Sequence, residues 1–112
     1  MRLPLPLWLT VTGSLVGCPS YEAVNTARAA QIIAGRTISS ACSTVEAVSR
    51  ADIIAACDVA MDVYDAHEAA VAALAALVEA DAGAESILTA TADVAWAAAK
   101  LKAAVERLEA IR

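Results

Sequence analysis

The sequence predicts an all-α protein, an alanine-rich antiparallel three-helix bundle or a helical hairpin with coiled-coil-like packing. Alanine, the best helix former, accounts for 30 of the 112 residues. Proline is absent after Pro19, and no segment alternates at a period of two for long enough to indicate a strand. Apolar residues recur instead at helical spacing from about residue 21 to the last residue.

Composition limits the function classes. A chain of 112 residues without Phe is too small for several domains, a large aromatic core or a deep substrate pocket. The apolar fraction is too high for a disordered chain. Because the net charge is −5, the electrostatic footprint of a nucleic-acid-binding protein is missing, and we expect no nucleic-acid partner.

The N-terminal residues have the pattern of an export signal. Arg2 supplies a positive charge, an apolar run follows, and small residues lead up to Cys18. The stretch from Leu3 to Gly17 has only 15 residues and is interrupted near its start by two prolines, whereas a membrane-spanning helix needs about 20 apolar residues. We therefore expect a signal that is cleaved off and not a transmembrane anchor.

Leu15, Val16, Gly17 and Cys18 resemble the lipobox of bacterial lipoproteins. The resemblance implies that Leu15, Val16 and Gly17 are the signal-processing residues, that the chain is cut before Cys18, and that this cysteine carries the lipid. Two or three acyl chains suffice for stable attachment to a membrane. Pro19 replaces the Asp that commonly retains such proteins in the inner membrane, which favours the outer membrane, facing the periplasm, if the host is Gram-negative.

The expected division of the chain is thus a signal peptide over 1–17, a lipidated cysteine with a short tether over 18–20, and a helical domain over 21–112. The alternative is an ordinary secretory signal with a chance cysteine, which would leave an unlipidated, secreted helical protein.

The first helix is expected over 21–48, with Ser20 as its N-cap. Gly35 and the Ser/Thr-rich residues after it are poor helix formers, and Ser43 and Thr44 indicate a kink. One heptad-like stripe forms its apolar face: Val24, Ala27, Gln31, Ala34, Ile38, Ala41, Val45 and Val48.

The second helix is expected over 52–82, after a capping box formed by Ser49 and Asp52. Its apolar face consists of Ile53, Cys57, Ala60, Tyr64, His67, Val71, Leu74 and Val78. The opposite face carries acidic residues and no Lys or Arg.

The third helix is expected over 85–112. Large apolar residues recur every seven positions, each followed three residues later by a partner: Ile87, Val94, Leu101 and Leu108, with Ala90, Ala97, Ala104 and Ile111. The stripes of the second and third helices point about half a turn apart, so one continuous helix would switch its apolar face. A turn near Gly83, with Gly83 as the C′ residue, removes this conflict.

Cys42 and Cys57 are predicted to form a disulfide. If the chain reverses near Ser49 and Arg50, the two cysteines lie about equally far from the turn on facing stripes. In one continuous helix they would stand roughly 22 Å apart. An exported protein meets an oxidising environment, and a loop of about 15 residues would be stabilised by about 3 kcal/mol. The alternative is two buried free thiols.

The single histidine, His67, is predicted to be a core or seam-edge residue. A general base or metal ligand on a helix needs a partner three or four positions away, and Val63, Tyr64, Ala70 and Val71 occupy those positions.

Asp58, Asp62 and Asp65 share one face of the second helix. They are predicted to be a solvated surface, with a divalent cation or a basic partner as the alternative. Trp96 points away from the stripe of its own helix. It either packs on a neighbouring helix or stays exposed, where it would contact a partner protein or the membrane surface.

The sequence contains no phosphate-binding glycine loop, nucleophile elbow, CxxC or HExxH pattern. We therefore expect no enzyme, no catalytic residue, no metal and no cofactor.

These observations predict a small lipid-anchored protein of the bacterial cell envelope that binds or scaffolds a protein partner through its helices, with a homo-oligomer as one arrangement. It is similar in outline to murein lipoproteins, but it ends in Ile111 and Arg112 and lacks their terminal lysine. The alternative is a phage or prophage lipoprotein, for superinfection exclusion or for host lysis in the manner of outer spanins. Outer spanins are commonly proline-rich after the lipidated cysteine, whereas here only Pro19 follows it.

Overall fold

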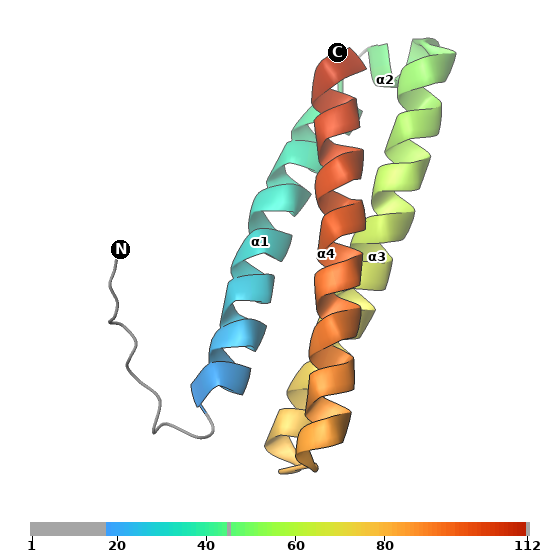
Figure 1. The fold of residues 1–112 in the computed structure, drawn as a ribbon. Helices are drawn as coiled ribbons and strands as arrows, with labels where there is room; N and C mark the ends of the chain where they lie inside the picture. The colour runs from blue at the N-terminus through green and yellow to red at the C-terminus, as the bar shows by residue number, and fades with distance from the viewer. Residues whose placement is uncertain (1–17, 45, 112) are drawn as a thin grey trace, which may run out of the picture.

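Three long helices form an up-down-up bundle (Figure 1). The computed structural model describes residues 18–44 and 46–111. Helix α1 runs over Cys18–Cys42, the short α2 over Glu46–Ser49, α3 over Ala51–Glu79 and α4 over Ala84–Ile111. The predicted all-α fold is confirmed, and it takes the three-helix form because α1 packs on both α3 and α4.

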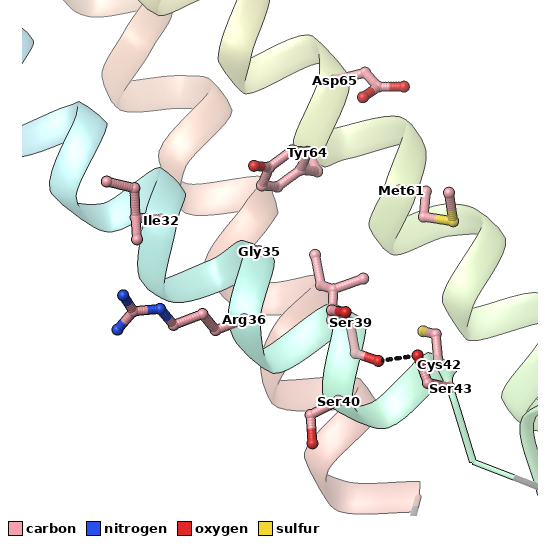
Figure 2. A pocket seen from close by; sticks show the side chains of 11 residues that line it. Ile32, Gly35, Arg36, Ser39, Ser40, Cys42, Ser43, Met61, Tyr64 and Asp65 are labelled. Carbon is pink, nitrogen blue, oxygen red and sulfur yellow. Dashed lines mark hydrogen bonds between the residues drawn. The ribbon is translucent and has the colours of Figure 1, made fainter.

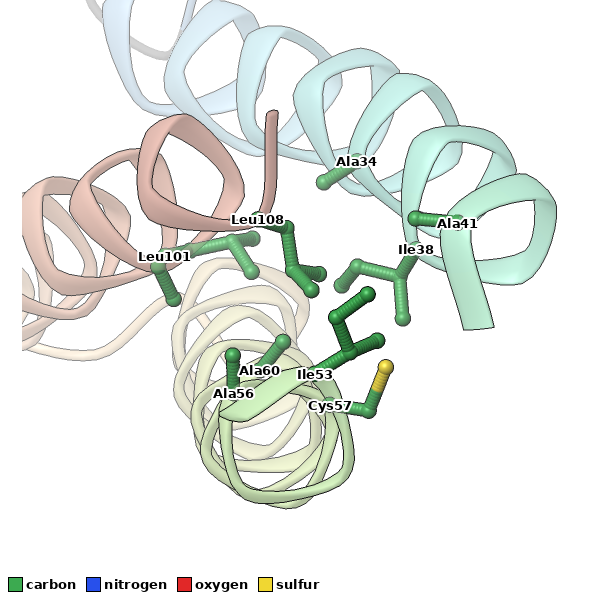
Figure 3. Packing of buried hydrophobic residues seen from close by; sticks show 10 residues of the cluster. Ala34, Ile38, Ala41, Ile53, Ala56, Cys57, Ala60, Leu101 and Leu108 are labelled. Atoms are coloured by element: carbon green, nitrogen blue, oxygen red, sulfur yellow. The ribbon is translucent and has the colours of Figure 1, made fainter. Parts of the chain in front are cut away.

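The core consists of two apolar clusters. The cluster at the α2 end, drawn in Figure 3, is formed by Ala34, Ile38, Ala41, Ile53, Ala56, Cys57, Ala60, Leu101, Ala104 and Leu108. The cluster at the opposite end is formed by Val24, Ala27, Val71, Leu74, Ala75, Ala90 and Val94. Alanine supplies about half of both sets, so the helices approach closely, and no Phe, Tyr or Trp is among the fully buried residues within 18–44 and 46–111. The buried residues follow the stripes predicted for the three helices.

Helix α1 begins at Cys18, so Ser20 lies inside the helix and its predicted role as the N-cap is wrong. The helix also ends earlier than expected. The predicted boundary at residue 48 is wrong, because the helix stops at Cys42. The Ser43 hydroxyl donates to the Ser39 carbonyl at 2.6 Å, and the Thr44 hydroxyl donates to the Ala41 carbonyl at 3.2 Å. Such local bonds compete with helix continuation. Val48 accordingly lies outside the stripe, with 78% of its surface exposed.

The start of α3 also differs from the prediction. The N-cap is Arg50, in an extended conformation and without a side-chain cap bond, whereas Ser49 belongs to α2. The capping box predicted from Ser49 and Asp52 is therefore wrong. The Asp52 carboxylate instead pairs with the Arg50 guanidinium and accepts from the backbone N–H of Ile53.

The turn between α3 and α4 lies near Gly83 as predicted, but another residue makes the reversal. Asp81 has a φ of 54°, and no described glycine has a positive φ. Ala82 N–H donates to the Leu77 carbonyl and Asp81 N–H to the Val78 carbonyl, which is the Schellman pattern with Asp81 at C′. Gly83 instead accepts the first hydrogen bond of α4, from Ile87 N–H. The prediction of Gly83 as the C′ residue is wrong.

Candidate functional site

A buried polar pair separates the two apolar clusters. Gln31 of α1 and His67 of α3 lie between them along the bundle, and His67 has no exposed surface. Gln31 Nε2 donates to the backbone carbonyl of Tyr64 at 3.2 Å, and Gln31 Oε1 contacts His67 Nδ1. These are the only two polar or charged side chains in the described core.

The hydrogen bonds fix the protonation of the imidazole. A carbonyl oxygen only accepts, so the Gln31 amide must turn its NH₂ toward the Tyr64 carbonyl and its oxygen toward His67. Since that oxygen also only accepts, Nδ1 of His67 carries the proton. Burial lowers the pKa of His67 below its ordinary value, which keeps the ring neutral. Nε2 is thus left with a lone pair.

Nothing among the described residues satisfies that lone pair. Nε2 is buried, and no donor within 18–44 and 46–111 reaches it. A buried acceptor without a partner costs about 1–3 kcal/mol, so the fold is destabilised by about this amount unless another molecule donates to Nε2.

The same stretch of α1 and α3 holds a close contact between Gly35 and Tyr64. A Cβ atom at Gly35 would lie 3.0 Å from Tyr64 Oη and 3.1 Å from Tyr64 Cε2. The missing side chain therefore allows the tyrosine ring to lie against the backbone of α1.

This contact forms one wall of a groove of about 920 Å³ between α1 and α3 (Figure 2). Arg36 and Asp65 supply opposite charges from the two helices that border it, and Ile32 and Met61 are exposed apolar residues along it. A second groove of about 460 Å³ lies between α1 and α4 and reaches His67. The sequence pattern does not predict these two grooves.

Cys42 and Cys57 lie at disulfide distance, with their Cα atoms 6.0 Å apart. The reversal of the chain after α1 brings them together as the hairpin argument predicts, and the pair covalently joins α1 to α3.

Trp96 takes the exposed alternative. Its side chain has 68% of its surface exposed, and the Lys100 ammonium lies 5.2 Å from the ring centroid. Leu88, eight residues earlier on α4, is also exposed.

Asp58, Asp62 and Asp65 are exposed along α3. Within the described ranges, no three His, Cys, Asp or Glu side chains come together in a group that could hold a metal ion.

The predicted lipobox lies largely outside the described residues. This applies to Leu15, Val16 and Gly17, while Cys18 is the first residue of α1. No described helix is both long enough and apolar enough to cross a membrane.

Sequence reasoning places Gln31 and His67 on the stripes of their own helices but does not pair them. The cysteine pair holds the missing signal, because it sets the register of α1 against α3. Seven residues before Cys42 is Gly35 and seven after Cys57 is Tyr64, the pair in close contact. Eleven before Cys42 is Gln31 and ten after Cys57 is His67.

No protein-family model, curated protein or solved structure matches this chain.

Proposed function

We propose that this chain is a small lipid-anchored protein of the bacterial cell envelope that acts without catalysis, by binding a protein partner through its helices. The observation that carries the proposal is the position of the lipobox relative to the fold. Leu15, Val16 and Gly17 precede Cys18, and α1 begins at Cys18 itself. A lipid on this residue would hold the bundle directly at the membrane surface.

Such an anchor would also orient the bundle. The N-terminal half of α1 packs with the ends of α3 and α4 that flank the Asp81 turn, so this end would face the membrane. Helix α1 has 25 residues and thus a length of about 38 Å. The end that holds Cys42 and Cys57 would stand about that far from the lipid surface.

The outer face of α4 is the surface on which we place the partner. Leu88 and Trp96 are exposed there, and Ala92, Ala95 and Ala99 between and beyond them are exposed as well. Tryptophan is enriched at the centres of protein interfaces, where its large ring buries much apolar area. These residues lie within 88–99, mostly in the half of α4 next to the Asp81 turn.

The anchor is tested by comparing the full chain with its Cys18→Ser variant, in the presence and absence of globomycin. Wild type is expected in the membrane fraction, carrying a lipid mass on Cys18. The variant is expected to lack this mass and to keep its signal peptide. Wild type treated with globomycin is likewise expected to keep its signal peptide. Wild type that is soluble, cleaved and free of lipid would contradict the anchor and favour the secreted helical protein.

The partner surface is tested with a photo-crosslinking residue introduced at Leu88, at Trp96 or, as a control, at the exposed Val59 of α3. We expect one discrete adduct from the two α4 positions and none from Val59. Mass spectrometry then assigns the adduct to an envelope protein, to a phage-encoded protein or to a second copy. Equal adducts at all three positions, or none at any, would remove α4 as the binding face.

A further inference from the structure

The groove between α1 and α4 differs from the groove between α1 and α3 because a fully buried histidine, His67, is among its lining residues. Its volume is about 460 Å³, within the range of small-molecule sites. Its lining consists of Ala30, Ile33, Ala34, Thr37, His67, Ala98, Leu101, Lys102, Val105, Glu106 and Glu109. His67 is the only α3 residue in this set, so α3 contributes this one side chain to a groove that otherwise lies between α1 and α4.

Two independent features of the groove agree on the chemistry of an occupant. Apolar side chains from α1 and α4, such as Ile33, Leu101 and Val105, suit an apolar body. The unpartnered Nε2 of His67 is an acceptor, because Nδ1 holds the proton against Gln31. An occupant therefore needs a hydrogen-bond donor at its inner end.

We propose that the α1–α4 groove is a binding site for a small molecule with an apolar body and one hydroxyl group, and that this hydroxyl donates to His67 Nε2. The hydrogen bond gives the buried acceptor the partner that the described residues do not supply. Because such a ligand is uncharged, its binding does not require the desolvation of a charged group.

The charges around the groove disfavour a carboxylate at the same place. Glu106 and Glu109 outnumber Lys102 among the lining residues. A carboxylate oxygen would also face the lone pair of Nε2 unless His67 gained a proton, which its burial opposes. An alcohol meets neither obstacle.

This site goes beyond the proposed function, since it lies in another part of the α4 surface from Leu88 and Trp96 and needs no lipid on Cys18. If the lipid anchor is disproved, the proposed binding site is unaffected. If the binding site is disproved, the proposed lipid anchor is unaffected.

The test uses the oxidised full chain and three probes with the same alkyl tail: 1-hexanol, hexyl methyl ether and hexanoate. His67 is the only histidine, so the imidazole nitrogen resonances in a ¹⁵N-labelled sample report on this residue alone. We expect the free protein to show a protonated Nδ1 and an unprotonated Nε2. Only 1-hexanol is expected to shift the Nε2 resonance in a saturable way.

Three variants separate the hydrogen bond from the apolar groove. His67→Phe removes the acceptor, and binding of 1-hexanol, followed by calorimetry, is expected to weaken about 2- to 10-fold, the value of one neutral hydrogen bond. Ala98→Leu places a larger side chain at a lining position of the groove and is expected to abolish the Nε2 shift. Ala73→Leu, at an exposed position of α3 outside the groove, is the matched control and should bind as wild type does.

Several results would overturn the proposal. A free protein with Nε2 protonated removes the acceptor. Hexyl methyl ether binding as tightly as 1-hexanol shows an apolar groove in which His67 has no role. If hexanoate binds and His67 becomes protonated, the site binds an anion and not an alcohol. If none of the probes shifts the Nε2 resonance, none of them binds at His67.

Discussion

The buried pair of Gln31 and His67 makes a double-mutant cycle the sharpest test of the core. Gln31→Leu leaves both nitrogens of a fully buried imidazole without a protein partner. His67→Leu leaves the Gln31 oxygen without a donor while its NH₂ still binds the Tyr64 carbonyl. Replacing both by leucine removes the unsatisfied groups altogether.

The expected magnitudes follow from this accounting. A buried group that loses its partner costs about 1–3 kcal/mol, so we expect Gln31→Leu to lower the free energy of unfolding by about 2 kcal/mol. We expect His67→Leu to change it by less than about 1 kcal/mol, because this substitution removes the unpartnered Nε2 while it leaves the Gln31 oxygen without a donor. The double variant is expected within about 1 kcal/mol of wild type, because replacing both partners by apolar groups is nearly neutral. The coupling energy between the two positions is then about 1–3 kcal/mol.

Urea unfolding of the oxidised protein, followed by far-UV circular dichroism near neutral pH, measures these differences. A loss of 2 kcal/mol moves the urea midpoint by about 1 M at a typical slope for a small domain. Asn25→Leu, at an exposed polar position of α1, is the control for adding an apolar side chain and should change the midpoint little. Additive single effects, or a Gln31→Leu variant as stable as wild type, would refute the hydrogen-bonded pair.

Three further predictions concern the disulfide, the Asp81 turn and the titration of His67. Reduction of the Cys42–Cys57 pair, whose partners are 15 residues apart, is expected to lower the free energy of unfolding by about 3 kcal/mol in urea titrations, an effect that a Cys42→Ser variant should abolish. Asp81→Gly is expected to raise the melting temperature by several degrees, because glycine adopts the positive φ at that position with about 1 kcal/mol less strain, while Asp81→Ala should bring no such gain. Since burial lowers the pKa of His67 in the folded state, the unfolded chain takes up the proton first; stability is therefore full above about pH 6.5 and falls as the pH drops below it toward the folded-state pKa. His67→Phe should flatten this part of the stability profile, and an unchanged profile would show that His67 does not cause it.

The seams of the three helices could be predicted from sequence because each follows from local periodicity. Val24, Ile38, Val94 and Leu101 are buried where the seven-residue spacing places them. The meeting of Cys42 and Cys57 was also accessible, because one chain reversal between two long helices leaves little freedom in their register.

The helix ends were not accessible in the same way. At Ser43 and Thr44, side-chain hydroxyls compete with the backbone for carbonyl groups. The spacing of apolar residues does not indicate this competition. At the second turn, both Asp81 and Gly83 are compatible with a left-handed backbone. The choice depends on where the last turn of α3 packs, which only the tertiary structure decides.

The candidate site lies at the limit of sequence reasoning. Gln31 and His67 were recognisable as polar residues on apolar stripes, but the bond between them depends on how α1 and α3 rotate about their axes. The free lone pair on Nε2 depends in turn on the orientation of one amide group, which has no counterpart in a sequence pattern.

The covalent link between Cys42 and Cys57 has a consequence for the order in which the bundle opens. It ties α1 to α3, while α4 is held by side-chain packing and by its connection through the Asp81 turn. Under oxidising conditions α4 is the one long helix that detaches without straining a covalent cross-link. Its amide hydrogens should therefore exchange with solvent through a partial opening in which α1 and α3 remain associated, and reduction should merge that event with global unfolding.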